Sequence, residues 1–494
     1  MSGTIHLHSG NIIIDPANEQ FARSITINNG LVWEVDKDPP SSATMIDLQG
    51  QTAVPGLIDS HIHLLLGING VGEVDLSECS CREEFESSMQ VGAKTLEDNE
   101  WLIASGWSEE TLGDYPSIDW LDCVGDIPSL CWRSDLHSAL VNKPLLAKLN
   151  IEQLSNMVGG ELSNDGIIKE TALWEGVCPF IPEATYEQTR HRLHKCVGAL
   201  HANGITMVGT MEHAQDLDEF LWSVRQELGL RIRAMLLDDP TPELFEYWGS
   251  SNSDPFLSVT GFKTFIDGSL GSRTAKMYEP YCNSNNSGML VAHAAEGELD
   301  NWVQKVSGAG FSPVMHAIGD KAVGLALASL QGVSTNSISR IEHAQFISEK
   351  DLQGIEGLLF GVQPLHKKTD DAIALHEVGE SRTKLLHNWR RMLDFGAKLS
   401  FGSDWPVAPH LPLEAMSIAI ESGLTPIEAL IATTTDAAAS LSEPLSGKLT
   451  LGCFGDITVL NCNPLECDWQ CQRPSVTMTI VSGEIKYRQE HTYA

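Results

Sequence analysis

The sequence predicts an α/β fold: a (β/α)8 TIM barrel with a small β-sandwich built from both chain ends and an insertion after the first barrel strand. Three observations predict it. Strand-like and helix-like segments alternate through the middle of the chain, short strands with turns occupy both ends, and 494 residues are too many for one ordinary core. We expect the sandwich over residues 1–53 and 445–494, the barrel over 54–444, and the insertion over about 64–183.

Eight segments are the candidate barrel strands, and eight β/α units close into a barrel. In chain order they are residues 52–63, 205–210, 231–237, 259–266, 313–318, 337–344, 359–364 and 398–404. Residues 186–203 form an amphipathic helical pattern that ends before Gly204, and Thr425-Pro-Ile-Glu428 is a capping box that opens a helix toward Leu441. The stretch between the first two strands is too long for a plain connection, so it indicates a subdomain over the mouth of the barrel.

Both ends of the chain have the pattern of short β-strands. Segments 24–28 and 31–35 flank Asn29-Gly30, a two-residue hairpin signal. Segments 456–460 and 476–481 near the other end have the same strand-like composition. We therefore expect the two ends to build one β-sandwich beside the barrel.

The composition limits the partners and the compartment. A formal net charge of −34 repels nucleic acid and anionic membrane surfaces, so we expect a small-molecule substrate and neither of those partners. The start of the chain lacks a secretory pattern, and the eleven cysteines include no Cys-x-x-Cys pair, which indicates reduced thiols in the cytoplasm. A homo-oligomer is compatible with the sequence.

The strongest local signal is the segment Val54-Pro-Gly-Leu-Ile-Asp-Ser-His-Ile-His63. Side chains alternate along a strand, so Asp59, His61 and His63 point to one face, here the barrel lumen. Two imidazoles two residues apart at the end of a strand can both reach one metal ion. The segment therefore predicts a metal site.

Later strands add further candidate ligands at the same end of the barrel. They are Lys263 in the fourth strand, His316 at the end of the fifth, His343 at the end of the sixth and Asp404 at the end of the eighth. A single buried histidine is more often a hydrogen-bonded core residue than a ligand. Convergence of several such residues on the catalytic end of one barrel favours the metal hypothesis instead.

These residues in this strand order resemble the amidohydrolase superfamily. Three further motifs resemble its branch of metal-dependent hydrolases that contains N-substituted formamide deformylases: Gly261-Phe-Lys-Thr-Phe-Ile-Asp-Gly-Ser-Leu-Gly-Ser-Arg273, His316-Ala-Ile-Gly-Asp320 and Val362-Gln-Pro-Leu-His366. The segment Asp135-Leu-His-Ser-Ala-Leu-Val-Asn142 in the insertion is similar to that branch too. The resemblance covers nearly the whole chain.

The resemblance implies hydrolysis of a carbon–nitrogen bond other than a peptide bond, in an amide or formamide-like small molecule, by a metal-activated hydroxide. It implies one or two divalent ions, usually zinc, and Asp404 as the group that takes the proton of the water and passes it to the leaving nitrogen. The implied ligands are His61, His63 and Asp404 for one ion and His316 and His343 for the other, with a carboxylated Lys263 between them. The alternative for Lys263 is an ordinary lysine, ion-paired to Asp267 or binding substrate.

Other candidates and other functions stay open at this point. His366 is a candidate catalytic residue that stabilises an oxyanion or orients substrate, and is otherwise a loop histidine. His137, Asn142 and Arg273 are weaker candidates for substrate contacts. A one-metal aminohydrolase and a catalytically inactive binding protein are the alternative functions. The former uses a glutamate soon after the histidine of the fifth strand, where this sequence has only Asp320.

Overall fold

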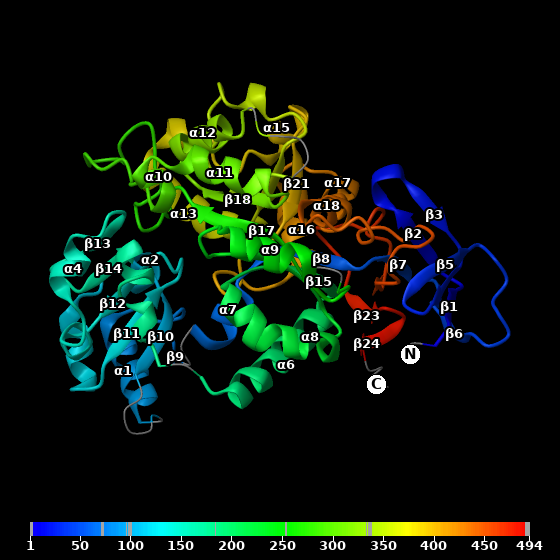
Figure 1. The fold of residues 1–494 in the computed structure, drawn as a ribbon, viewed down its shortest axis with the longest axis horizontal. Coiled ribbons are helices and arrows are strands. Elements are labelled where there is room, and N and C mark those ends of the chain that lie inside the picture. Colours follow the sequence, from blue (N-terminus) through cyan, green and yellow to red (C-terminus); the bar gives the residue numbers. More distant parts are fainter. Residues whose placement is uncertain are drawn as a thin grey trace.

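A computed structural model describes residues 3–70, 74–94, 96, 101–182, 184–251, 254–331, 333 and 338–489. Figure 1 shows a central barrel, the cyan insertion on one side of it and strands from both chain ends on the other. The blue N-terminal strands lie beside the red β23 (Val476–Val481) and β24 (Glu484–Arg488). The fold class is the one that the sequence predicts.

The barrel is a sheet of eight parallel strands in sequential order, and their side chains are almost all buried, as expected for a sheet covered by helices. The strands are β8 (Leu57–Ile62), β15 (Ile205–Glu212), β16 (Arg231–Leu236), β17 (Leu257–Phe265), β18 (Ser312–Ala317), β19 (Arg340–His343), β20 (Leu359–Val362) and β21 (Lys398–Phe401). Two hydrogen bonds join the last strand to the first: Asp404 N donates to His61 O at 2.7 Å, and His63 N donates to Trp405 O at 2.8 Å. This seam lies at the carboxyl ends of β8 and β21, so it brings His61, His63 and Asp404 together.

The predicted first strand is two strands. Residues Thr52–Pro55 form β7, which pairs with β22 (Ile457–Leu460) of the sandwich, and only β8 belongs to the barrel. The break falls at Gly56, where an added Cβ would lie 2.1 Å from Oγ1 of Thr206. Only a residue without a side chain lets the backbone pass this close to β15 as it crosses from one part to the other. The start of the predicted sixth strand, Ser337, lies outside the described residues.

Helices cover the outside of the barrel. The longer ones are α6 (Tyr186–Ala202), α8 (Trp222–Leu228), α9 (Pro242–Ser251), α11 (Leu299–Gly308), α12 (Asp320–Ser329), α13 (Lys367–Val378), α15 (Trp389–Asp394) and α16 (Pro412–Glu421). The predicted capping box of Thr425 and Glu428 is present, but the helix it opens, α17 (Pro426–Ala432), ends before Leu441. The backbone of Thr434 is not helical there and its hydroxyl donates to Leu430 O at 2.6 Å, so a separate helix, α18 (Thr435–Ser440), follows.

The sandwich consists of two sheets whose inner faces share one core. One sheet has the order β5 (Leu31–Val35), β4 (Ile25–Asn28), β1 (Ile5–His8) and β6 (Thr44–Asp47). The other has the order β24, β23, β22, β7, β2 (Asn11–Asp15) and β3 (Gln20–Ala22). Leu7 and Ile25 of the first sheet and Ile480 of the second lie fully buried in the same apolar cluster.

The insertion is built around a six-stranded sheet with an apolar core on each face. Its elements include β9 (Val74–Asp75), α1 (Arg82–Ala93), β10 (Leu102–Trp107), β11 (Ser129–Arg133), β12 (Ser138–Val141), α3 (Lys143–Leu146), β13 (Gly160–Leu162) and β14 (Ile167–Glu170). Trp107 and Trp132 are buried in its two cores, so these indoles serve packing. Across the described part of the chain, no helix has the length and apolarity that crossing a membrane requires.

Candidate metal centre

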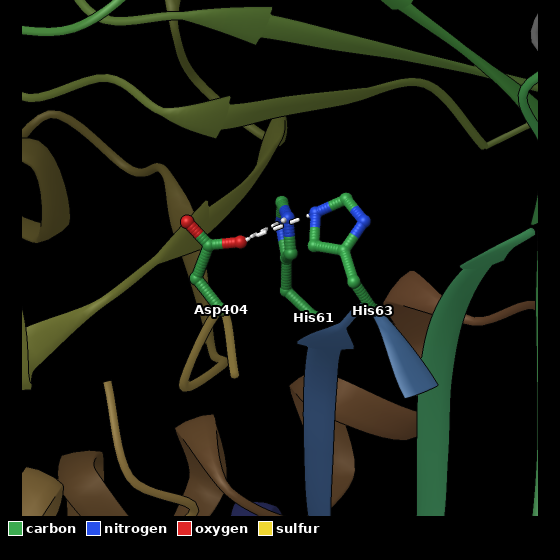
Figure 2. Close-up of side chains that lie close together, drawn as sticks. All are labelled: His61, His63 and Asp404. Atoms are coloured by element: carbon green, nitrogen blue, oxygen red, sulfur yellow. Dashed lines mark ion pairs between the residues drawn. The ribbon is translucent and has the colours of Figure 1, made fainter. Parts of the chain in front are cut away.

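His61, His63 and Asp404 meet at the carboxyl end of the barrel (Figure 2). The Nε2 atoms of His61 and His63 lie 3.2 and 3.3 Å from the same oxygen, Oδ1 of Asp404. Nε2 of His61 is buried and has no hydrogen-bond partner, although that oxygen is close. Ligand atoms about 2.0–2.2 Å from an ion in a tetrahedral site lie about 3.3–3.5 Å from one another, so these spacings fit a shared divalent ion.

The backbone at the seam explains how Asp404 reaches the two imidazoles. An added Cβ at Gly402 would lie 2.4 Å from Cβ of His61, so glycine allows the chain after β21 to pass against β8. Asp404 itself has a φ of 59°, in the left-handed region that non-glycine residues seldom adopt. Ser403 N donates to Oδ1 of Asp59 at 2.9 Å and anchors this turn to the strand that carries His61.

A buried ion pair holds the ring of His61 at Nδ1, the nitrogen on the other side of the ring from the Nε2 that lies near Asp404. Nδ1 of His61 is hydrogen-bonded to Oε2 of Glu342, and Nη2 of Arg340 lies 2.8 Å from Oε1 of the same carboxylate. Burial would raise the pKa of Glu342, but Arg340 and His61 lower it to about 2. An added Cβ at Gly361 would lie 2.1 Å from Oε2 of Glu342, so a glycine on β20 makes room for this carboxylate.

Such a carboxylate fixes the tautomer and orientation of an imidazole and leaves Nε2 for a metal. Arg340 and Glu342 are not among the candidate residues predicted from the sequence. The only available signal was their place three and one residues before His343, because alternation on a strand puts Arg340 and Glu342 on the same face.

His316, His343 and His366 extend the centre beyond Asp404. The rings of His316 and His343 are 4.4 Å apart, and that of His343 is 5.1 Å from the ring of His61. Ligand atoms of His343, His366 and Asp404 all lie within 4.8 Å of one another, so these three form a second group that could hold a metal. Nδ1 of His343 and Nε2 of His366 are buried without hydrogen-bond partners. Nε2 of His316 lies 3.2 Å from Gly268 O instead.

Lys263 is buried beside these histidines with no hydrogen-bond partner for Nζ. Burial lowers the pKa of this lysine to about 8. The alternative that pairs it with Asp267 is wrong, because that carboxylate instead accepts hydrogen bonds from the backbone N–H groups of Ile318, Gly319 and Lys276 at 2.9, 2.9 and 2.7 Å. A buried amine without a hydrogen-bond partner is uncommon in folded proteins.

The protonation states of Asp404, His316 and His343 suit metal ligation. Burial would raise the pKa of Asp404, but His61 and His63 hold it well below its usual range. Burial lowers the pKa of His316 and of His343 well below the ordinary value. Ionised carboxylates and neutral imidazoles are the forms that bind metal.

The three weaker candidates for substrate contacts lie in different parts of the structure. The ring of His137 lies 5.1 Å from that of His316, so the structure brings this residue of the insertion to the centre. Asn142 instead caps α3, where Oδ1 accepts from Leu145 N and Nδ2 donates to Ile127 O. Arg273 forms a two-pronged ion pair with Glu377, at 2.7 Å for both hydrogen bonds. Structural contacts therefore account for Asn142 and Arg273, and we propose neither as a substrate residue.

A set of imidazoles and a carboxylate at the carboxyl end of a (β/α)8 barrel defines the class of metal-dependent barrel hydrolases. The profile of the Amidohydrolase family matches residues 44–487, and the chain belongs to that family. The chain is therefore a metal-dependent hydrolase of the amidohydrolase family.

Individual relatives and a solved structure are similar to this chain along most of its length. The chain is 29% identical to the protein LONG AFTER FAR-RED 3 of Arabidopsis thaliana, over 97% of this chain and 91% of the relative. It is 22% identical to the N-substituted formamide deformylase of Arthrobacter pascens, over 97% of this chain and 98% of that enzyme. A crystal structure of an uncharacterized metal-dependent hydrolase from Pyrococcus horikoshii superposes with a TM-score of 0.75 at 25% identity, covering 95% of this chain and 100% of that one.

Proposed function

We propose that the chain hydrolyses the carbon–nitrogen bond of a small amide or formamide-like molecule, with zinc as its metal. The observation that carries the proposal is the approach of two imidazole nitrogens, at 3.2 and 3.3 Å, to one oxygen of Asp404. Similarity along the whole chain to an N-substituted formamide deformylase supports the choice of bond. Imidazole and carboxylate ligands suit zinc.

The ligand assignment is the one that the family resemblance implies. His61, His63 and Asp404 would hold one ion, and His316 and His343 the second. A bound divalent ion would supply Lewis acidity, which makes water a stronger acid and polarises a carbonyl. Lys263 would join the two sites as a carbamate, formed when its neutral amine adds carbon dioxide and loses a proton. Its amine is buried without a hydrogen-bond partner, and an unmodified ammonium has no lone pair to offer a cation.

Asp404 and His366 have roles toward the substrate in this proposal. Asp404 takes the proton of the attacking water on its carboxylate and passes it to the leaving nitrogen, as base and then as acid. His366 orients the carbonyl oxygen through Nε2, which is buried and free of other hydrogen bonds. A ring nitrogen of His366 belongs to the group of ligand atoms that includes Asp404 and His343, so a ligand role at the second ion is the alternative for this residue.

The aminohydrolase alternative lacks its acid. Asp320, the carboxylate that follows His316, stands at the start of α12 and accepts a hydrogen bond from Tyr278 N at 2.9 Å. A carboxylate that anchors a neighbouring loop is poorly placed to protonate a ring nitrogen.

The test is hydrolysis by the zinc-loaded protein of three substrate classes: N-substituted formamides, N-acyl amino acids and ring amidines. We expect release of amine from a member of the first two classes, abolished in His61→Ala, and no ammonia from the third. Ammonia from ring amidines without amide hydrolysis would establish the aminohydrolase alternative. A fully metal-loaded protein without turnover on any class would support the inactive binding protein.

A further inference from the structure

The insertion contributes a histidine–carboxylate pair to the rim of the metal centre. Nδ1 of His137 lies 3.0 Å from Oε2 of Glu170, and the other carboxylate oxygen accepts a hydrogen bond from Oγ1 of Thr274 at 2.5 Å. The ring of His137 is 5.1 Å from that of His316, across the boundary between insertion and barrel. Since Glu170 occupies Nδ1, the ring offers its second nitrogen, Nε2, to a ligand.

The loop after β17 is shaped to receive this pair. An added Cβ at Gly268 would lie 2.0 Å from Oε1 of Glu170, and one at Gly271 would lie 2.3 Å from a guanidinium nitrogen of Arg133. The two glycines therefore let the insertion approach the backbone that follows Lys263. Gly268 also contacts the centre itself, because its carbonyl oxygen lies 3.2 Å from Nε2 of His316. This accounts for the glycines of the segment Asp267-Gly-Ser-Leu-Gly-Ser-Arg273.

A second anchor fixes the backbone of His137. The carboxylate of Asp135 accepts hydrogen bonds from Ser269 Oγ at 2.5 Å and Ser272 Oγ at 2.8 Å, both on the same barrel loop. Its other oxygen accepts from His137 N at 3.1 Å. The ring is thus held from two sides, by Glu170 at Nδ1 and by Asp135 at the main chain. Such double support is typical of a side chain whose orientation matters for function.

The backbone strain at Glu170 and the exposure of His137 also favour a functional role for this pair. Glu170 has φ 50° and ψ −131°, a conformation that residues with a side chain rarely adopt and that clusters at functional sites. The side chain of Glu170 is 4% exposed, whereas that of His137 is 15% exposed. The carboxylate is therefore sealed inside, while the imidazole that it holds is reachable by a small molecule.

We propose that His137 is a substrate-contacting residue that the insertion adds to the metal centre, and that Glu170 and Thr274 are positioning residues for its ring. Nε2 of His137 hydrogen-bonds the polar group that the substrate carries beside the scissile bond. Docking of the insertion on the loop 267–274 then completes the active site. This inference rests on the proposed amide hydrolysis.

The test compares His137→Gln, Glu170→Gln and Thr274→Val in the cobalt-loaded full chain. His194→Gln is the matched control, because His194 forms a similar pair with Glu227, at 3.1 Å, between side chains that are 42% and 39% exposed. Cobalt absorption and metal content report on the centre, and the melting temperature reports on folding. Titration with acetohydroxamate, a small amide analogue that binds metals, reports on the substrate site without turnover.

We expect His137→Gln to lower kcat/KM about 100-fold and to lower the affinity for acetohydroxamate about 10-fold. Cobalt absorption and metal content should be unchanged. Glu170→Gln and Thr274→Val should act in the same direction but less strongly. Thr274→Ser, which keeps the hydroxyl, should restore activity, and His194→Gln should have no effect. If the wild-type chain cleaves no amide, the proposed reaction fails, whereas the acetohydroxamate titration still decides the role of His137.

Two results would overturn the inference. One is a His137→Gln variant whose kcat/KM and acetohydroxamate affinity equal those of the wild type. The other is loss of cobalt in that variant, which would make His137 a support of the metal and not a contact of the substrate. If His137→Gln fails to fold, the pair Thr274→Val and Thr274→Ser decides, and a silent Thr274→Val counts against the proposal.

Discussion

Replacement of Glu342 by Gln should reduce both the stability of the barrel and its metal affinity, for separable reasons. The carboxylate lies between Arg340 and His61, and the side chains of all three residues are 0% exposed. Glutamine leaves the guanidinium of Arg340 buried without its counter-ion, and loss of one partner of a buried ion pair costs about 3–5 kcal/mol. We expect the free energy of unfolding of the metal-free protein to fall by about that amount. Replacement of the carboxylate at His61 Nδ1 by a neutral amide should weaken metal binding about 10- to 100-fold.

Urea unfolding of the metal-free protein measures the stability, and competition with a chelator measures the zinc affinity. Glu349→Gln is the control, because Glu349 pairs with Arg391 between side chains that are 61% and 38% exposed, where solvent screens an ion pair and its contribution to stability is small. The double variant Arg340→Met/Glu342→Gln removes both charges. This double variant should recover much of the stability but not the zinc affinity, because Nδ1 of His61 still lacks a carboxylate as its hydrogen-bond partner. Wild-type zinc affinity in Glu342→Gln would refute the idea that this carboxylate orients His61.

Three further predictions follow from the centre and from one remote histidine. Lys263→Ala should lose activity and at least one metal equivalent, and short-chain acids with bicarbonate should restore part of both; two retained metals with full turnover would contradict the bridging role. Asp404→Asn should lower kcat about 100-fold or more and lose less metal than His61→Ala; a near-normal kcat would reject Asp404 as the proton carrier. Burial lowers the pKa of His201 to about 4, so the unfolded chain binds the proton more tightly and stability is lost as the pH falls from about 6.5 toward 4. His201→Gln should therefore reduce the stability difference between pH 7 and pH 5 by about 2 kcal/mol in urea unfolding, and an unchanged difference would contradict this assignment.

Local sequence patterns predicted the barrel and the candidate ligands, because each of these features shows in a few neighbouring residues. Asp59, His61 and His63 alternate along one strand, so the sequence shows that their side chains share a face. The barrel strands are parallel, so the carboxyl ends of all of them lie at the same end of the barrel. The capping box at Thr425 was visible for the same reason. Its helix ended early because Thr434 hydrogen-bonds a carbonyl of the preceding turn, which a capping signal does not reveal.

Contacts between distant segments were the part that the sequence did not reveal. The break at Gly56 depends on the approach of Thr206, and the partner of His61 is Glu342, 281 residues further along the chain. The pairing of His137 with Glu170 is equally hidden, because Glu170 ends β14, 33 residues after the turn that carries His137. Each of these contacts depends on which distant segments the fold brings together, and a single sequence carries no local signal for such a pairing.

Metal content per chain, measured by elemental analysis together with amide hydrolysis, tests the metal-dependent mechanism most directly. The wild-type protein should carry about one to two equivalents of a divalent metal. Chelation should abolish hydrolysis and added zinc should restore it, while His61→Ala should lose both metal and turnover. A folded, metal-free wild-type protein whose turnover resists chelation, with His61→Ala equally active, would contradict it.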